Sequence, residues 1–358
     1  MKKTRVGILG ATGMVGQRFV SLLENHPYFE VVVLAASSNS SGMKYIDSVN
    51  DRWKLNQPIP EYAKNIIVED VQNVDSVKEK VDLVFCALNM DKDEIIKIEE
   101  LYAKSEVVVV SNNSAHRWTE DVPMLMPEIN SHHLEAIQAQ KDRLGTKKGF
   151  IIVKPNCSIQ SYVPALNALK DFGLEKVVVS TYQAISGSGK NFSDWPEMVD
   201  NVIPFISGEE AKSELEPLKI WGTFDGKKFV NASEPIISAQ CIRVPVLDGH
   251  LATVSVKFKE KPSKEEIIKR WKEYRSEIEK YQLPLSPNKF LTYFEEENRP
   301  QTKLDRDLYN GMGISIGRLR EDNIYDYKFV CLSHNTLRGA AGGALLGAEL
   351  LKAKGLLD

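Results

Sequence analysis

Hydrophobic runs and helical patterns alternate along the first 150 residues. Short apolar, β-branched runs stand at residues 5–10, 30–36, 81–88 and 107–112. Between them, residues 14–25 and 92–104 repeat their apolar positions with the spacing of a helix. Continuous β-branched runs joined by helices are typical of a parallel sheet covered on both faces. The pattern predicts a doubly wound α/β domain of the Rossmann type, which binds dinucleotides.

The hydrophobic pattern changes after about residue 150. Longer runs that alternate more stand at residues 177–184, 238–246, 251–259, 313–320 and 328–335. They predict a second, α+β domain with a mixed sheet. Residues 264–281 read as a charged surface helix, and residues 336–355 as a small-residue helix that ends in a glycine cap. Since small residues allow close packing, we expect residues 336–358 to return to the first domain (1–154), which leaves 155–335 as the second.

Composition narrows the function classes. A formal net charge of −3 over 358 residues gives no electrostatic case for binding nucleic acid. No apolar run has transmembrane length and no signal peptide fits before the first strand, so we expect a cytoplasmic protein without membrane contact. The four cysteines form no CxxC pair. A disulfide framework or a cysteine-bound metal is therefore not expected.

A glycine loop follows the first predicted strand. It reads Gly10-Ala-Thr-Gly13-Met-Val-Gly16, with Ile8 where the usual GxGxxG pattern has its first glycine. Small residues let backbone amides approach a pyrophosphate, and the positive end of a helix dipole favours it. The candidate cofactor-binding residues are Gly10, Thr12, Gly13, Met14 and Val15. The alternative is a tight packing turn between strand and helix.

The end of the second predicted strand bears on cofactor choice. NAD-binding proteins usually place a carboxylate there for the ribose hydroxyls. Here the strand ends in Ser37 and Ser38 without a carboxylate, and Lys44 follows. Hydroxyls with a nearby cation suit a 2′-phosphate, so we predict NADP rather than NAD. A flexible polar loop is the alternative.

A candidate nucleophile stands at the start of the second domain. Cys157 lies in Lys-Pro-Asn-Cys-Ser, between the apolar run 149–153 and a helix-like segment at 162–172. The dipole of a following helix favours the thiolate, which is the species that attacks carbonyl carbon. Asn156 and the backbone N–H of Cys157 could stabilise the resulting oxyanion. A lone cysteine is more often a small core residue, but the polar turn here favours a nucleophile.

His250 has the most suggestive surroundings of the six histidines. It follows the strand-like run 236–246, which carries Arg243, and a turn separates the two. Histidine exchanges protons near neutral pH, and the arginine fork binds carboxylates. From spacing alone, a surface salt bridge and a structural histidine remain the alternatives.

Seven motifs in order carry a family resemblance: GATGMVG, SNNSAHRW, KPNCS, TYQAISGSG, GEEAK, RVPVLDGH and NTLRGAAGG. Through them the chain resembles the aspartate-β-semialdehyde dehydrogenase family over essentially its whole length. Each motif alone is moderately specific, whereas the ordered set is strong. The sequence around HRWTEDVPMLMPEIN favours the archaeal and fungal-like branch.

The resemblance implies a role for each matching residue. Cys157 would be the nucleophile that forms a thioester, and His250 the acid/base. Gln183 would orient the acyl intermediate, and Arg243 would bind the substrate's α-carboxylate. The other implied roles are Glu209 for the substrate amine, Lys212 and Arg117 for phosphate, Ser186, Gly187 and Gly189 for the turn beside the nicotinamide ring, and Asn335 for its carboxamide. A solvated helix face is the alternative for Glu209 and Lys212, and Glu210 is the alternative register.

The implied reaction is the NADPH-dependent reductive dephosphorylation of L-aspartyl-4-phosphate to aspartate semialdehyde, on the route to lysine, threonine and methionine. The resemblance also implies a homodimer or homotetramer formed through the second domain. Malonyl-CoA reductase and N-acetyl-γ-glutamyl-phosphate reductase are rivals with related chemistry, but neither needs a carboxylate for a substrate amine. A non-catalytic dinucleotide sensor is the rival from another class, and it would need neither Cys157 nor His250.

Overall fold

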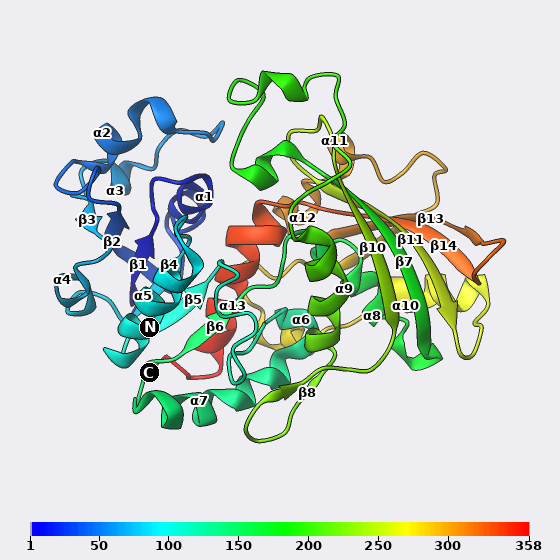
Figure 1. The fold of residues 1–358 in the computed structure, drawn as a ribbon. Coiled ribbons are helices and arrows are strands. Elements are labelled where there is room, and N and C mark those ends of the chain that lie inside the picture. Colours follow the sequence, from blue (N-terminus) through cyan, green and yellow to red (C-terminus); the bar gives the residue numbers. More distant parts are fainter. Residues whose placement is uncertain (1, 358) are drawn as a thin grey trace.

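The computed structural model describes residues 2–357 and has two sheets side by side (Figure 1). The first sheet is parallel throughout and follows the doubly wound order expected of a dinucleotide-binding domain. Across the sheet its strands are β3 (Glu69–Asp70), β2 (Phe29–Ala36), β1 (Thr4–Leu9), β4 (Leu83–Cys86), β5 (Val108–Ser111) and β6 (Ile151–Val153). The predicted Rossmann-type domain is confirmed.

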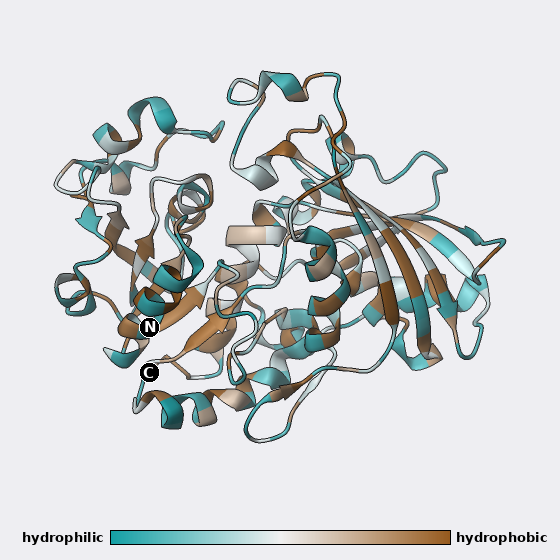
Figure 2. Cartoon of the chain, in the orientation of Figure 1, coloured by the Kyte–Doolittle hydropathy of each residue, from teal (hydrophilic) through white to brown (hydrophobic). Residues whose placement is uncertain are grey.

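The second sheet is mixed, as the alternating runs predicted. Across the sheet its strands are β10 (Ile236–Arg243), β7 (Leu174–Gln183), β11 (His250–Phe258), β14 (Tyr327–Ser333), β13 (Ile314–Glu321) and β12 (Leu291–Phe294). β10 pairs parallel with β7, whereas β11 is antiparallel to both of its neighbours. The short strands β8 (Thr223–Phe224) and β9 (Phe229–Val230) form a separate two-stranded hairpin that pairs with neither six-stranded sheet. In Figure 2, hydrophobic residues follow the strands of both sheets, while loops and outer helices are mostly hydrophilic.

Helices cover the first sheet and one face of the second. Their bounds are α1 (Met14–Leu22), α2 (Tyr45–Val49), α3 (Glu61–Lys64), α4 (Val74–Lys78), α5 (Lys92–Lys104), α6 (Pro127–Asn130), α7 (Ile137–Leu144), α8 (Val163–Asn167), α9 (Glu209–Ile220), α10 (Lys264–Glu273), α11 (Thr302–Asp305), α12 (Leu308–Gly311) and α13 (Gly342–Ala353). On the second sheet, Val179 and Val254 pack in one core with Leu166 of α8 and Trp271 of α10. Alternate strand residues therefore face helices, and those between them face away from this core.

The C-terminal helix α13 packs against the first sheet. Leu345 and Leu346 share a buried cluster with Ile8, Phe85 and Val108, and Figure 1 places α13 between the two sheets. The small residues of this helix from Gly342 to Ala348 are all buried, as close packing requires. The end of the chain therefore contributes to the core of the nucleotide-binding half.

Four predicted helices differ from the structure. The helix predicted at 14–25 ends at Leu22. Residues 162–172 form only the short α8 and a 3-10 turn at Lys170–Phe172. The surface helix ends at Glu273, because Ser276 starts a new 3-10 turn with a capping box of its own. The last helix begins with a π-helical turn, Leu337–Ala341, in which Ala340 leaves the helical conformation. Within residues 2–357, no helix is both long and apolar enough to cross a bilayer.

Candidate active site

A cavity of about 260 Å³ brings together predicted residues from both halves of the chain. Its walls include nine of them: Val15, Arg117, Asn156, Cys157, Ser186, Gly187, Glu209, Lys212 and Asn335. A neighbouring cavity shares Ser186 and reaches Met14 at the start of α1. The nucleophile motif and the start of the cofactor helix therefore meet at one place, although they are more than 140 positions apart in the sequence.

Cys157 directly precedes a single 3-10 turn, Ser158–Gln160. Its Sγ lies 3.5 Å from Nε2 of His250, so the predicted nucleophile and its partner do meet. Burial raises the pKa of the Cys157 thiol, and the nearby carboxylate of Glu209 raises it further. The sequence had suggested a helix dipole that lowers this pKa, but one 3-10 turn supplies little dipole and burial dominates.

His250 is the first residue of β11 and is completely buried. The backbone N–H of Ala184 donates to its Nδ1 across 3.0 Å. Burial lowers the pKa of His250 well below its ordinary value, and the positive charge of Arg243 adds to this effect. Gly187 packs against the ring, because a Cβ at this position would lie 3.2 Å from Nε2. The imidazole is therefore fixed in orientation and neutral near pH 7.

Arg243 and Gln183 lie side by side at the ends of β10 and β7, where they are register partners. Nη1 of Arg243 donates to the carbonyl of Ala184 at 2.6 Å. Nε2 of Gln183 donates to Glu209 at 3.2 Å. Both residues are buried. The strand ends thus place a guanidinium and an amide beside the nucleophile.

Glu209 is the first residue of α9, and its carboxylate faces the cavity. It accepts hydrogen bonds from Nδ2 of Asn156 at 3.0 Å and from Nζ of Lys212 at 2.8 Å. Burial would raise the pKa of Glu209, but Lys212 and these hydrogen bonds hold it below its ordinary value. Glu210 instead accepts the backbone N–H of Cys241 at 3.4 Å. The carboxylate that lines the cavity is therefore that of Glu209.

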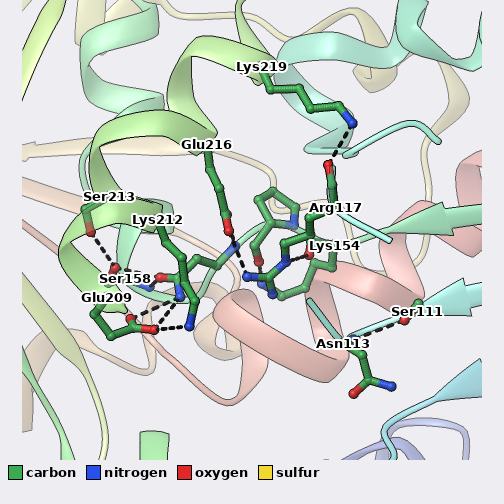
Figure 3. Close-up of polar contacts among 12 residues, drawn as sticks. Ser111, Asn113, Arg117, Lys154, Ser158, Glu209, Lys212, Ser213, Glu216 and Lys219 are labelled. Atoms are coloured by element: carbon green, nitrogen blue, oxygen red, sulfur yellow. Dashed lines mark hydrogen bonds and ion pairs between the residues drawn. The ribbon is translucent and has the colours of Figure 1, made fainter. Parts of the chain in front are cut away.

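Glu216 is a site residue that no sequence motif indicated, and it is completely buried two turns further along α9. Its Oε1 accepts from Nη1 of Arg117 at 2.9 Å, and its Oε2 accepts the backbone N–H of Asn156 at 2.6 Å. Figure 3 shows Glu209, Lys212, Glu216 and Lys219 extending from this one helix. Their spacing of three to four residues marks a polar stripe on one helix face, a signal that could have identified Glu216.

Lys154, between β6 and Cys157, is a second residue that sequence analysis passed over. It lines the cavity and is only 4% exposed. Its backbone carbonyl accepts from Nε of Arg117 at 3.0 Å, and its Nζ donates to the carbonyl of Pro155. Burial lowers the pKa of Lys154 to about 7, and neighbouring Arg117 lowers it in the same direction.

The glycine loop fits a dinucleotide. A Cβ on Gly16 would lie 2.1 Å from the carbonyl oxygen of Gly10, and one on Gly10 would lie 2.4 Å from that of Ala87. These two glycines are therefore needed for packing. A Cβ on the exposed Gly13 would meet no atom closer than 3.6 Å. Gly13 is also the N-cap residue of α1, and no side chain caps this helix. The loop thus leaves Gly13 and the helix N-terminus open to an anion.

The remaining predicted cofactor residues lie at two separate places. Ser37 and Ser38 are exposed just after β2. Asn335 is buried at the cavity, where Nδ2 donates to Ser186 at 2.8 Å and Oδ1 accepts the backbone N–H of Gly249 at 2.7 Å. The side chain of Asn335 thus bridges two turns by hydrogen bonds, the turn that contains Ser186 and the turn at Gly249 that precedes His250. Within residues 2–357, no group of three or more His, Cys, Asp or Glu side chains could hold a metal ion.

A dinucleotide-type sheet joined to a mixed sheet, with a cysteine and a histidine between them, defines a class of semialdehyde dehydrogenases. The family model described as "Semialdehyde dehydrogenase, NAD binding domain" matches residues 5–137. The model described as "Semialdehyde dehydrogenase, dimerisation domain" matches residues 166–338.

Close relatives narrow this class. The chain is 44% identical over 348 residues to the aspartate-semialdehyde dehydrogenase of Archaeoglobus fulgidus, with 97% of each chain covered. It is 41% identical over 370 residues to that of Saccharomyces cerevisiae, with 99% of each covered. The crystal structure of the Candida albicans enzyme with NADP superimposes with a TM-score of 0.87 at 38% identity, covering 99% of this chain and 100% of that one. The chain belongs to the aspartate-semialdehyde dehydrogenase family, and the archaeal and fungal-like resemblance is confirmed.

Proposed function

We propose that this member of the family reduces L-aspartyl-4-phosphate through a thioester on Cys157, with NADPH as the cofactor. The observation that carries the proposal is the 3.5 Å distance from Sγ of Cys157 to Nε2 of His250, at a cavity lined by Cys157 and Glu209. A thiol beside an imidazole is the usual arrangement for covalent acyl transfer. A dinucleotide sensor would not need it.

The charges around Cys157 suit an amino acid phosphate. Within residues 2–357, the guanidinium of Arg243 makes no ion pair with a carboxylate and donates to the carbonyl of Ala184, so it can bind the α-carboxylate of the substrate. Glu209 offers a carboxylate to the ammonium group. Lys212 and Arg117 are the cations for the phosphate. Malonyl-CoA carries no ammonium group and would leave the buried Glu209 without a substrate partner.

The proposed chemistry starts at the thiolate of Cys157. Sulfur attacks the acyl carbon, the C–O bond to phosphate breaks, and phosphate leaves with the electron pair. When bound, NADPH supplies the hydride that reduces the thioester. Nε2–H of His250 stabilises the negative charge on oxygen as the C–S bond breaks. Gln183, fixed by Glu209, orients the acyl group. Nδ2 of Asn156 donates to both carboxylate oxygens of Glu209 at 3.0 Å, so Asn156 holds the substrate-binding carboxylate in place.

NADP is the proposed cofactor because the end of β2 carries exposed hydroxyls. Gly13, Met14 and Val15 would bind the pyrophosphate at the open N-terminus of α1, and Ser37 and Ser38 would contact the 2′-phosphate. The loop Ser186–Gly189 and Asn335 would hold the nicotinamide end beside the cavity. Gly189 has a φ of 75°, which favours glycine at this turn.

A homodimer is the proposed assembly, with a tetramer as the larger alternative. The face of the second sheet turned away from its helices carries Val178 and Ile236, which are 36% and 66% exposed, together with the half-buried Tyr182 and Ile242. Tyr182 and Ile242 are register partners on the neighbouring strands β7 and β10, while Val178 pairs with Ser238 and Ile236 with Lys176 on the same face. Exposed apolar groups on a flat sheet favour a protein partner. Val178→Glu should dissociate the dimer in sedimentation velocity, and an unchanged mass would exclude this face.

The deciding experiment is phosphate-dependent oxidation of aspartate semialdehyde, measured with NADP and NAD side by side. We expect activity that requires phosphate and a higher kcat/KM with NADP. Malonyl-CoA with NADPH is the matched alternative substrate. Turnover of malonyl-CoA without turnover of aspartate semialdehyde would overturn the proposed substrate, and a preference for NAD would overturn the role of Ser37 and Ser38.

A further inference from the structure

The segment of chain that carries Arg117 has no regular secondary structure of its own. Residues 112–123 lie between β5 and α6 and form neither a helix nor a strand. When such a segment is buried, its backbone carbonyls need hydrogen-bond donors from elsewhere in the protein. Arg117 and Val122 are both buried. The groups that donate to these carbonyls therefore decide how firmly the proposed phosphate ligand is held.

The ammonium group of Lys219, near the end of α9, supplies these donors. Its Nζ donates to the carbonyl of Arg117 at 2.7 Å, to that of Thr119 at 3.2 Å and to that of Val122 at 3.1 Å. Within residues 2–357, no other group donates to the carbonyls of Arg117 and Val122. Figure 3 shows Lys219 extending from the helix to the backbone of Arg117. A lysine has three N–H donors, so this one segment can use all of them.

Lys219 is held in an enclosed place. Its side chain is only 3% exposed, and Nζ lies 5.0 Å from the centroid of the Phe229 ring and 6.0 Å from that of Trp118. Burial lowers the pKa of Lys219 to about 8, so the group still carries its proton at pH 7. Hydrogen bonds from a charged donor are stronger than neutral ones, and low solvent exposure strengthens them further. One side chain therefore holds three carbonyls of the Arg117 segment together.

The same helix also holds the side chain of Arg117. Glu216, one turn before Lys219 on α9, accepts from Nη1 of Arg117 at 2.9 Å, and Nε of Arg117 donates to the carbonyl of Lys154 at 3.0 Å. Within residues 2–357, Nη2 of Arg117 makes no hydrogen bond, and the side chain lines the cavity. Helix α9 thus fixes both the backbone and the guanidinium of Arg117, and one edge of the guanidinium stays available for an anion.

We propose that Lys219 is a positioning residue for phosphate, which directs the available edge of Arg117 into the cavity through its three hydrogen bonds to the Arg117 segment. This inference rests on the proposed function, in which Arg117 binds phosphate. Of the described residues, those that line the cavity do not include Lys219, so Lys219 acts through Arg117 and not on the substrate directly. Contacts between an arginine fork and a phosphate depend on geometry. A displaced Arg117 backbone therefore weakens phosphate binding more than it affects the reaction at Cys157.

The test is the phosphate dependence of aspartate semialdehyde oxidation by the full-length protein. Lys219→Met keeps most of the side-chain length and removes the ammonium group. We expect the KM for phosphate to rise about tenfold, because the hydrogen bonds from a charged donor are lost. The kcat at saturating phosphate and the KM for aspartate semialdehyde should stay within about threefold of the wild type. An unchanged KM for phosphate would overturn the proposal, and so would a loss spread evenly over kcat and both KM values, which a general folding defect produces.

A double-mutant cycle with Arg117→Met tests whether Lys219 acts through Arg117. Once Arg117 has been replaced, Lys219→Met should change the KM for phosphate by less than about twofold. A further tenfold rise in the double variant would show that the two residues act independently and would overturn the proposal. A wild-type rate that does not depend on phosphate would contradict the proposed function, and this inference with it. A phosphate-dependent wild type with independent effects of the two substitutions would contradict only the role of Lys219.

Lys170→Met is the matched control. Nζ of Lys170 lies 5.9 Å from the centroid of the Trp221 ring at the end of α9, and within residues 2–357 it donates no hydrogen bond to the Arg117 segment. Its substitution should leave the KM for phosphate within about twofold of the wild type.

Lys219→Gln covers the case in which Lys219→Met fails to fold, because its amide group keeps two N–H donors. Glutamine is shorter and neutral and cannot reach all three carbonyls, so the KM for phosphate should still rise about fivefold. A wild-type KM for phosphate in Lys219→Gln would contradict the proposal.

Discussion

The carboxylate of Glu216 accepts the backbone N–H of Asn156 at 2.6 Å, directly before the nucleophile Cys157. The other oxygen of the same carboxylate binds Arg117 at 2.9 Å. One buried side chain thus fixes both the turn that presents sulfur and a cation proposed for phosphate. Glu216 touches no reacting atom, so it is a positioning residue.

Glu216→Gln should lower both stability and turnover. Glutamine offers a single acceptor oxygen, so either Arg117 or Asn156 loses its partner inside the protein. Breaking a buried pair costs about 3 kcal/mol of unfolding free energy, and we expect kcat to fall about tenfold because the nucleophile turn loosens. Urea unfolding and steady-state kinetics measure the two effects. Glu214→Gln on the same helix is the control, since it keeps an acceptor for the N–H of Ala239; equal effects of both variants would contradict the positioning role.

Cys157→Ser should abolish turnover while cofactor binding persists. A hydroxyl in this buried site is a far weaker nucleophile than a thiolate, so kcat should fall by about three orders of magnitude or more. The dissociation constant for NADPH, measured by fluorescence titration, should stay within about twofold, because the proposed cofactor contacts come mainly from α1 and its loop. Cys331→Ala, a buried change on β14 away from the cavity, is the matched control. Substantial turnover by Cys157→Ser would show that no thioester forms.

Much of this arrangement could be predicted from the sequence because local patterns determine it. The β-branched runs predicted both sheets, and the run 236–246 predicted Arg243 on a strand with His250 beyond the turn that follows it. The roles of the two side chains came from the family resemblance and not from this spacing. The role of Glu216 could not be predicted in the same way, because its importance depends on two partners that are 99 and 60 positions away. The pKa of Cys157 was misjudged for a related reason: the helix after it is one turn long, and burial by residues distant in sequence dominates.

Gly13→Ala and Gly16→Ala should separate cofactor binding from folding. In the protein without cofactor, a methyl group at Gly13 meets no atom closer than 3.6 Å, so the unfolding free energy should change by less than about 1 kcal/mol. The same methyl group would obstruct the bound cofactor, so the KM for NADPH should rise about tenfold or more. At Gly16 a Cβ would lie 2.1 Å from the carbonyl oxygen of Gly10, so the same substitution should destabilise the fold itself. Thermal unfolding and cofactor titration distinguish the two. An unchanged KM in Gly13→Ala would exclude close approach of the cofactor at this residue.

His133 should make the fold sensitive to acid. The side chain is completely buried. Its Nδ1 lies 3.0 Å from the side-chain Nδ2 of Asn130, and its Nε2 lies 3.0 Å from the backbone carbonyl oxygen of Gly222. Burial, together with the nearby charge of His132, lowers the pKa of His133 from 6.5 to about 4. Between these two pH values the unfolded chain binds a proton that the folded chain refuses, so the unfolding free energy falls as the pH falls from 6.5 towards 4.

His133→Gln removes this proton-binding difference and should flatten the pH dependence. We call the difference in unfolding free energy between the wild type and His133→Gln the stability gap. This gap should be about 2 kcal/mol smaller at pH 5 than at pH 7, because protonation of His133 is suppressed over about 1.5 pH units in the folded protein. Urea unfolding at both pH values measures the gap, and comparing the change in the gap rather than its size removes any constant packing loss in the variant. His132→Gln, a change at the exposed neighbour, should alter the pH dependence much less, because burial is the main cause of the lowered pKa of His133. A gap that stays constant between pH 7 and pH 5 would mean that His133 binds its proton equally well in the folded and the unfolded chain.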